Sequence, residues 1–556
     1  MEVCARACQT RCIVLECWEL IVNKPFYERN KLVIDNPKAN VCFEELLNMT
    51  PEQFREWVIY LRKTIVKSWD ENGCPLRTGK DEEDIIYNWN KLGEYPVHKF
   101  THTDELSDIE DDVIINKSSM GSEVDQFFPN MMQVRINYTQ KDNGYSVYDL
   151  VADDKYLDRV VKGSLRHFRR DSMYNYSRSC MAYDSEISLI STDTAMNWIE
   201  SFFDSNNEMI FNGYDFWLEQ VTKKEGVSTG YSQVDMTKLL QLTREEVQKL
   251  YDDGKLEYKH HSTFDIEDMP DDRVYSIRLY EKGQRIFPAG FKAFRIGYIQ
   301  VPVNFPPATA KYLYERYTDH LVGKQEVIKI YDPSSGWGGR ILGAMSVRDD
   351  GRKIHYIGTD PNPDNIMEDG TSKYQAIADF YNTKTTRSNP FFSNQNTYEV
   401  FQHGSEEIAN DPAFQKHKGD IDLVFTSPPY FNREAYSEDE NQSYKKYGDS
   451  YESWKLGFLE PTLKTAVEWL KPGGYLLWNI ADLLISGEYL PLEDDSKIIL
   501  ESLGMEYKYV LKMAMASMPG QHRLDENGIP KCKNYCKVNG RYLKYEPIFV
   551  FQKPLD

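Results

Sequence analysis

The sequence contains no long apolar run. Among its 556 residues, no uninterrupted apolar stretch reaches the ~18 residues that a membrane span would need. Near the N-terminus, Glu16 and Glu19 interrupt the segment that would have to form the apolar part of a signal peptide. We therefore expect an intracellular, cytoplasmic protein with no membrane partner.

Cysteine is also scarce. Nine cysteines in a chain of this length form no dense disulfide framework, as is usual in a reducing compartment. Structural zinc sites usually show a shorter Cys-x-x-Cys spacing than the cysteines of this chain, so we interpret them as packing groups rather than ligands and predict no metal. The two groups with a loose ligand-like spacing are Cys4, Cys8, Cys12 and Cys17, and later Cys532 and Cys536.

A net positive charge is absent. The formal net charge of -21 excludes a protein whose whole surface binds nucleic acid, although phosphate contact needs Lys and Arg only at the contact surface. The segment 162–178 interleaves arginine with aromatic residues, which suits phosphate contact and base stacking, and a solvated helix face is an equal alternative. The candidate DNA contacts are Arg166, Arg169, Arg170 and Arg178.

The clearest change of pattern along the chain falls near residue 295. Beyond it, short apolar runs alternate with helix-length segments, at 327–332, 355–360, 421–427 and 474–480. Such alternation is typical of parallel strands joined by crossover helices. The sequence therefore predicts a doubly wound, Rossmann-like α/β domain over residues 295–556.

The first half is less regular, and we expect it to be mixed and largely helical. Thr50 and Pro51 begin a well-capped helix in the segment 1–110. In the segment 111–294, a probable target-recognition or accessory region, residues 236–258 resemble a helix-turn-helix: a short helix, a turn, and a second helix that Thr243 caps. Acidic residues on the second helix argue against base reading.

A glycine-rich loop follows the first predicted strand of the α/β domain. Its glycines permit a tight turn and a close approach to a ligand, and the helix that follows presents unpaired amide groups. The next strand ends in Asp360, which predicts a contact to ribose hydroxyls, with a turn aspartate before Pro361 as the alternative. After the third strand, Ser405 lies where an adenine edge is expected. The candidate binding residues of the loop are Asp332, Pro333, Ser335, Gly336 and Gly338.

The strand at 421–427 leads into Ser427, Pro428, Pro429 and Tyr430, which we call the tetrapeptide. Ligands of open α/β sheets bind at this end of a strand. Two prolines donate no amide hydrogens and hold the neighbouring carbonyl groups rigidly. Rigid acceptors can position an exocyclic amine, and Tyr430 can stack on a base that has left the helix. We therefore predict that the tetrapeptide is catalytic, although a stiff turn is the structural alternative.

With these motifs the chain resembles the amino-methyltransferases of DNA, whose signature is Asp, Asn or Ser followed by Pro-Pro and an aromatic residue. The loop at Asp332 resembles the family's methionine-binding loop, although Ser334, Trp337 and Arg340 are unusual in it. The resemblance covers residues 295–556. It implies S-adenosyl-L-methionine as the cofactor and double-stranded DNA as the partner.

The resemblance implies methyl transfer to adenine N6 or cytosine N4 of a flipped base, and it does not decide between them. Serine at the first position of the tetrapeptide leans mildly to cytosine. Whether a restriction nuclease is paired with the enzyme also stays open. The alternatives are methylation of an RNA base or a protein glutamine, and a catalytically silent nucleic-acid-binding protein of the same fold.

Overall fold

The computed structural model describes most of residues 33–164 and 302–555, and between them only 216–221, 238–242 and 274–279. Within the longer ranges it leaves out 42–48, 76–81, 108–112, 137–143, 386–395, 516–528 and a few single residues and pairs. The chain divides into two compact units that are discontinuous in sequence. The first unit comprises residues 1–31, 74–146 and 301–556, and the second comprises 32–73 and 147–300. The sequence had instead indicated three consecutive segments.

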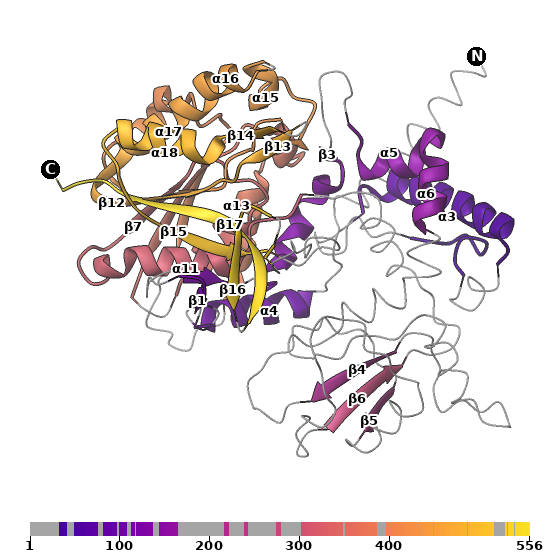
Figure 1. The fold of residues 1–556 in the computed structure, drawn as a ribbon. Helices are drawn as coiled ribbons and strands as arrows, with labels where there is room; N and C mark the ends of the chain where they lie inside the picture. The colour runs from indigo at the N-terminus through magenta and orange to yellow at the C-terminus, as the bar shows by residue number, and fades with distance from the viewer. Residues whose placement is uncertain are drawn as a thin grey trace, which may run out of the picture. The chain divides into compact units, whose positions relative to one another are not determined.

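The first unit is built on a ten-stranded sheet whose central strands run in the order β9-β8-β7-β10-β12-β17-β15 (Figure 1). The first five of these are parallel, and β17 is antiparallel to both of its neighbours. The central strands are β7 (Ile328–Asp332), β8 (Ile354–Thr359), β9 (Thr397–Phe401), β10 (Ile421–Thr426), β12 (Leu470–Asn479), β15 (Glu506–Ala514) and β17 (Arg541–Gln552).

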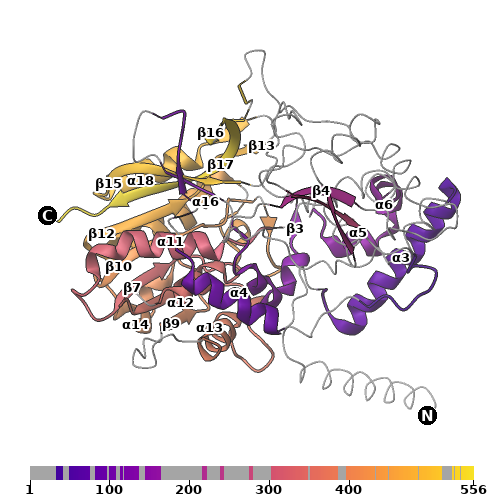
Figure 2. The same cartoon turned by 90° about the horizontal axis from the view of Figure 1, so that it is seen from below.

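Helices cover both faces of this sheet, which confirms the predicted doubly wound fold. Figure 1 shows α17 and α18 on one side and α11 on the other, and Figure 2 presents the face with α11, α12 and α13. One face carries α4 (Glu82–Glu94), α11 (Pro307–Thr318), α12 (Gly339–Ser346) and α13 (Lys373–Thr383). The other carries α14 (Pro412–Gln415), α15 (Ser443–Lys446), α16 (Tyr451–Trp454), α17 (Glu460–Trp469) and α18 (Leu492–Ser502).

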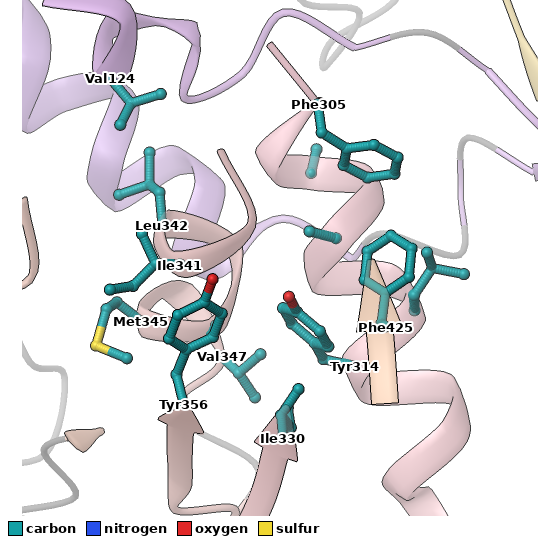
Figure 3. Packing of buried hydrophobic residues seen from close by; sticks show 14 of the residues in the cluster. Val124, Phe305, Tyr314, Ile330, Ile341, Leu342, Met345, Val347, Tyr356 and Phe425 are labelled. Carbon is teal, nitrogen blue, oxygen red and sulfur yellow. The ribbon is translucent and has the colours of Figure 1, made fainter. Parts of the chain in front are cut away.

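Neighbouring residues of each strand pack into different cores, because side chains alternate across a sheet. Ile330 and Tyr356 belong to the cluster under α11 and α12, whereas Tyr331 and Ile357 belong to the cluster under α14 and α17. Figure 3 shows Ile330 and Tyr356 rising from their strands towards Tyr314 of α11. Burial on both faces explains why these strands read as continuous apolar runs.

Part of the N-terminal half is integral to the first unit. Strands β1 (Thr101–Thr103) and β2 (Val113–Ile115) extend the sheet beyond β15. The ammonium group of Lys311 donates to the carbonyl groups of Leu92, Gly93 and Tyr95 at 2.7–3.1 Å, which satisfies the otherwise unpaired C-terminal carbonyls of α4. Nothing in the local sequence pattern indicated that residues 82–136 pack on this domain.

Three smaller pairings complete the first unit. Strand β16 (Tyr535–Val538) pairs with β17, β3 (Arg135–Ile136) pairs with β11 (Glu434–Ala435), and β13 (Leu483–Ile485) pairs with β14 (Glu488–Leu490). Two short 3-10 turns, η2 (Ser122–Phe127) and η3 (Pro129–Met132), follow β2, and η2 lies against α12 and α13. No helix in the described part of the chain is long and apolar enough to cross a bilayer.

The second unit contains α3 (Pro51–Asn72), α5 (Val147–Ala152) and α6 (Leu157–Ser164). Thr50 and Gln53 form a capping box at the start of α3, which confirms the predicted helix. The buried guanidinium group of Arg62 on α3 donates to the Asp153 carbonyl at 2.7 Å. Trp69 of α3 packs edge to face on Tyr148 of α5, with ring centroids 5.1 Å apart.

A separate three-stranded antiparallel sheet in this unit corrects one prediction. It consists of β4 (Phe216–Val221), β6 (Val274–Leu279) and β5 (Lys238–Leu242). The short first helix expected within 236–258 is wrong, because residues 238–242 form β5 and pair with β6. A short apolar run fits a helix or a strand equally well, and only long-range pairing decides. The second helix of that motif lies outside the described residues.

Candidate active site

The structure brings three of the sequence-predicted segments together at the carboxyl ends of β7, β8 and β10. Neighbouring strands are paired in parallel, so that these ends meet at one edge of the sheet. The Ser334 amide in the glycine loop donates to the Thr426 hydroxyl at 3.2 Å, one residue before the tetrapeptide. The Gly336 amide donates to the Asp360 carboxylate at 3.1 Å.

The two predicted glycines of the loop have different surroundings. Both adopt a positive φ, 61° at Gly336 and 79° at Gly338, which only glycine adopts readily. A Cβ at Gly338 would lie 2.5 Å from Ile377 and 2.7 Å from Phe128, so this glycine permits close packing. A Cβ at Gly336 would meet no atom closer than 3.5 Å. A Cβ there would make ordinary contacts with the Arg340 side chain and the Ser334 carbonyl, so Gly336 is needed for its backbone conformation and not for close packing.

Asp332, at the end of β7, is completely buried, and its carboxylate is used by the chain itself. Its Oδ1 accepts from the Thr426 hydroxyl at 2.7 Å and from the Ser334 amide at 3.2 Å. Its Oδ2 accepts from Arg340 Nε at 2.8 Å and from the Tyr356 hydroxyl at 2.6 Å. In this arrangement the carboxylate joins β7, β8, β10 and α12, and it does not face a ligand directly.

Arg340, unexpected from the family pattern, is the counter-ion of Asp332. Burial alone would lower its pKa, but the charge of Asp332 and the hydroxyl group of Tyr356 raise it above its ordinary value, so the guanidinium stays charged. It also donates to the Ser334 carbonyl and lies over the Phe305 ring, 5.7 Å from the centroid. The arginine therefore holds the loop from its buried side.

Pro333 and Ser335 tie the loop to β8. The Pro333 carbonyl accepts from the Thr359 hydroxyl at 2.6 Å, and the Ser335 amide donates to the Thr359 carbonyl at 2.9 Å. Before α11, the Asn304 side chain donates to the Trp337 carbonyl at 2.7 Å and accepts from the Gly339 amide at 3.2 Å. Asn304 was not singled out from the sequence, because its two partners lie more than 30 positions further along the chain.

Asp360 is only partly buried at the end of β8. Its Oδ1 accepts from the Asn362 amide at 2.9 Å, so it also stabilises a turn, as the alternative interpretation held. Burial raises the pKa of Asp360 to about 6, although hydrogen bonds from Asn362, Tyr374 and Gly336 oppose the shift. Partial exposure leaves this carboxylate accessible beside the loop.

Ser405 has a different environment from the loop residues. It is buried, and its hydroxyl lies 2.9 Å from the Thr462 hydroxyl of α17. The neighbouring Glu406 carboxylate accepts from the Tyr447 hydroxyl at 2.8 Å and from Lys446 at 3.2 Å. The side chain of Ser405 therefore supports the packing of α17 on the sheet.

The tetrapeptide follows β10 directly, and its Tyr430 is anchored. The Tyr430 hydroxyl donates to Glu546 Oε1 at 2.5 Å and lies 3.3 Å from the Asn479 carbonyl. Burial raises the pKa of Glu546. Burial and the nearby charge of Glu546 together raise the pKa of Tyr430 well above its ordinary value. Glu546, on β17, was not singled out from the sequence, because Tyr430 lies 116 positions away from it.

Backbone strain follows the tetrapeptide. Phe431 is the one non-glycine residue with a positive φ, 48°, in the part of the chain that the structure describes. Its ring is buried against Tyr451 and Trp454, with centroids 6.0 and 5.8 Å away. Such conformations cluster at functional sites and persist only where packing enforces them. The packing of Phe431 therefore fixes the direction in which the chain leaves Tyr430.

The remaining residues singled out in the sequence lie elsewhere or outside the described part of the chain. The candidate DNA contacts Arg166, Arg169, Arg170 and Arg178 lie outside the described residues, as do Cys4, Cys8, Cys12 and Cys17. Cys532 and Cys536 are free thiols, and Cys536 is buried. Its sulfur lies 3.6 Å from the Leu543 carbonyl.

Comparisons with known proteins match the C-terminal part of the chain. Residues 421–555 match a family model described as DNA methylase, and this range contains the tetrapeptide and Glu546. No similar sequence was found among curated proteins. Similar solved structures include an S-adenosylmethionine-dependent methyltransferase from Methanosarcina mazei, with 12% identity, coverage of 44% of this chain and 98% of that one, and a TM-score of 0.24.

Another similar structure is that of a candidate DNA modification methylase from Thermus thermophilus, complexed with S-adenosyl-L-methionine. Its identity is 21%, with coverage of 27% of this chain and 53% of that one, and the TM-score is 0.17. The match thus spans about half of that protein's length. The resemblance and the cofactor predicted from the sequence, S-adenosyl-L-methionine, are confirmed, and residues 421–555 carry the sequence pattern of the DNA methylase family.

Proposed function

We propose that this chain transfers the methyl group of S-adenosyl-L-methionine to an exocyclic amino group, adenine N6 or cytosine N4, of a flipped base in double-stranded DNA. One observation carries the proposal. The tetrapeptide lies within the segment that matches DNA methylases, and hydrogen bonds through Thr426 and Ser334 join its strand to the glycine loop. A methyl donor at the loop and an amine at the tetrapeptide would therefore meet at one edge of the sheet.

The residues at this edge fit a nucleoside cofactor. A partly exposed carboxylate such as that of Asp360 can accept two hydrogen bonds from a vicinal diol. Gly336 is only partly buried, and because it carries no Cβ its backbone allows a ligand to approach closely. In this proposal Asp360 and Gly336 contact the cofactor, while Asp332, Pro333, Ser335 and Gly338 hold the loop in shape. Ser405 acts through the packing of α17.

The proposed chemistry is positioning of a weak nucleophile. The lone pair of an exocyclic amine is delocalised into the base, and acceptors for its two hydrogens favour a localised lone pair. The carbonyl groups of Ser427 and Pro428 are the proposed acceptors, and the Tyr430 ring stacks on the base. The bound cofactor supplies an electrophilic methyl group. The carbonyl groups of Ser427 and Pro428 would hold the amine nitrogen for direct attack on that carbon with displacement of the sulfur, and the product amine would release a proton to solvent.

Glu546 contributes by fixing Tyr430. The hydroxyl anchor at 2.5 Å restricts the tyrosine ring to one orientation before a base arrives. A stacking surface that is already ordered saves the entropy of ordering it on binding, and small misplacements of reacting groups cost about 100-fold in rate. We therefore include Glu546 as a positioning residue for the proposed reaction.

Target recognition is assigned to residues outside the sheet unit. The net charge of -21 requires that phosphate contacts be local, and the arginines Arg166, Arg169, Arg170 and Arg178 are the proposed contacts. They lie in the segment 111–294, which the sequence marks as a target-recognition or accessory region. Charge reversal at these positions should weaken binding to all DNA sequences alike and reduce its dependence on salt.

The test uses the full chain with Pro428→Ala and Tyr430→Ala. Each should lower methyl transfer to duplex DNA by at least about 100-fold because the amine and base are no longer positioned. Binding of S-adenosylmethionine, measured by calorimetry, should stay within a few-fold of the wild type. Tyr87→Ala, an exposed tyrosine of α4 with 66% relative exposure, is the matched control. Undiminished methylation by both variants would show that the tetrapeptide is not the reacting centre.

The same assay separates the alternatives when duplex DNA, tRNA and protein are offered with labelled cofactor. If the label appeared in tRNA or in protein glutamine and none appeared in DNA, then RNA or protein, and not DNA, would be the substrate. Failure to bind S-adenosylmethionine would instead favour a silent nucleic-acid-binding protein. Digestion of methylated DNA to nucleosides would distinguish adenine N6 from cytosine N4.

A further inference from the structure

A group of three metal-type ligands lies away from the candidate active site. One donor atom each from His355, Glu399 and His417 falls within 4.8 Å of the others. His355 is the second residue of β8, five residues before Asp360, which corresponds to about 16 Å along a strand. The group therefore lies towards the amino ends of the strands, whereas the candidate active site lies at their carboxyl ends.

We propose that His355, Glu399 and His417 bind one zinc ion. Two imidazole nitrogens and a carboxylate oxygen form a ligand set that zinc accepts, with water in the fourth position. In a tetrahedral site with bonds of about 2.0–2.2 Å, the donors lie about 3.3–3.5 Å apart. The donor atoms are at most 4.8 Å apart, so they must approach one another by about 1 Å to bind zinc, and side-chain rotations can supply this movement.

His417 carries an unsatisfied nitrogen in the present arrangement. It is buried with 3% relative exposure, and its Nε2 lies 2.9 Å from Glu399 Oε2. Its Nδ1 is buried and has no hydrogen-bond partner among the described residues. Buried polar atoms without a partner are uncommon in folded proteins. Nε2 is the nitrogen that faces the Glu399 carboxylate, so it is the atom that would bind the ion, and Nδ1 takes no part in the site.

The surroundings of the group resemble those of a supported metal site. The His355 Nδ1 lies 2.8 Å from the Thr397 hydroxyl, which fixes the ring's orientation as a supporting hydrogen bond would.

Lys416 is the feature that opposes the proposal, and it yields a test of its own. Its ammonium group pairs with Glu399 Oε1 at 2.5 Å, on the oxygen that does not face His417. The carboxylate can keep this ion pair and offer Oε2 to a cation. Because a positive charge beside the site repels zinc, Lys416→Met should tighten zinc binding.

The consequence of zinc binding would be structural. β9 forms one edge of the sheet within the described part of the chain, and it pairs only with β8 there. An ion held by β8, β9 and the turn after α14 would fasten this edge. A ligand that binds only the folded state raises the melting temperature, and the rise grows with the logarithm of the free ligand concentration once the site is filled.

The experiment titrates the full chain, stripped of metal by a chelator, with zinc in a calorimeter and with cobalt in an absorption spectrometer. We expect one zinc ion bound through this group, cobalt absorption typical of tetrahedral coordination, and a higher melting temperature with zinc. His355→Ala and His417→Ala should each weaken zinc binding at this group by at least about 100-fold. His320→Ala, an exposed histidine outside the group, is the matched control and should bind as the wild type does.

Two results would overturn the proposal. One is the absence of zinc binding by the folded wild-type chain. The other is binding that survives in both histidine variants, which would come from other ligands such as Cys4, Cys8 and Cys12. Circular dichroism checks that each variant is folded. If His417→Ala does not fold, the partly exposed His355 and the opposite effect of Lys416→Met still decide the outcome.

Discussion

The buried pair of Asp332 and Arg340 gives the sharpest prediction. Asp332→Asn keeps the shape of the side chain but leaves the Arg340 guanidinium, with 4% relative exposure, without its counter-ion. Removing one partner of a buried ion pair costs about 3–5 kcal/mol because the other charge stays buried. Arg340→Met should cost a similar amount for the same reason. Both variants should therefore unfold at clearly lower urea concentrations than the wild type.

The double variant Asp332→Asn, Arg340→Met should recover much of this loss. Neither charge is then buried, and replacing a buried pair by neutral groups of similar volume is often close to neutral in stability. Additivity would predict a combined cost of about 6–10 kcal/mol, so a coupling energy of about 3 kcal/mol or more is expected in the cycle. Unfolding in urea measures this coupling energy. If the chain unfolds in more than one transition, the transition that S-adenosylmethionine shifts belongs to the unit that contains Asp332 and Arg340.

The same variants distinguish a supporting aspartate from a binding one. If Asp332 holds the loop, the folded double variant should bind S-adenosylmethionine within about tenfold of the wild type. If Asp332 contacts the cofactor directly, as the sequence predicted, loss of the charge-assisted hydrogen bond costs about 1.5–3 kcal/mol, or about 10- to 150-fold in affinity. A folded double variant that has lost about 100-fold in affinity would refute our reading of the hydrogen bonds.

Two further predictions concern the open side of the site. Because an ionised carboxylate accepts ribose hydrogen bonds and the pKa of Asp360 is about 6, affinity for S-adenosylmethionine should rise as the pH increases through about 6. Calorimetry across this range checks it, and the same rise in Asp360→Asn would contradict it. Gly336→Ala should cost only about 1–2 kcal/mol of left-handed strain, since its methyl group would make ordinary contacts with Arg340 and the Ser334 carbonyl. Gly338→Ala adds about 1–3 kcal/mol of overpacking against Ile377 and Phe128, so equal melting temperatures for the two variants would refute the distinction.

The raised pKa of Asp360 also determines how the stability of the fold changes with pH. The folded state binds the proton more tightly than the unfolded chain does, since burial disfavours the charged form. Its contribution to the free energy of unfolding is therefore largest at low pH and falls as the pH rises to about 6. The pH that favours cofactor binding is thus the pH at which this carboxylate stabilises the fold least.

The sequence by itself determined the α/β domain and the place of its site. Four predicted runs correspond to β7, β8, β10 and β12, because strands buried on both faces leave an apolar signal that needs no knowledge of their partners. Residues that follow such strands must meet at one edge of a parallel sheet, which places Asp360 and the tetrapeptide together. The start of α3 could also be predicted from the local sequence, since the capping box lies within a few residues of Thr50.

Only the tertiary structure decided the partners of these residues. Glu546 anchors Tyr430 from 116 positions away, and Lys311 caps α4 from more than 200 positions away. The strand at 238–242 depends on its pairing with β6, whereas its own sequence fits a helix equally well. Local patterns encode which element a segment forms and which end of it faces a ligand. Contacts between distant segments decide whether a carboxylate such as Asp332 is open to a ligand or already bonded within the fold.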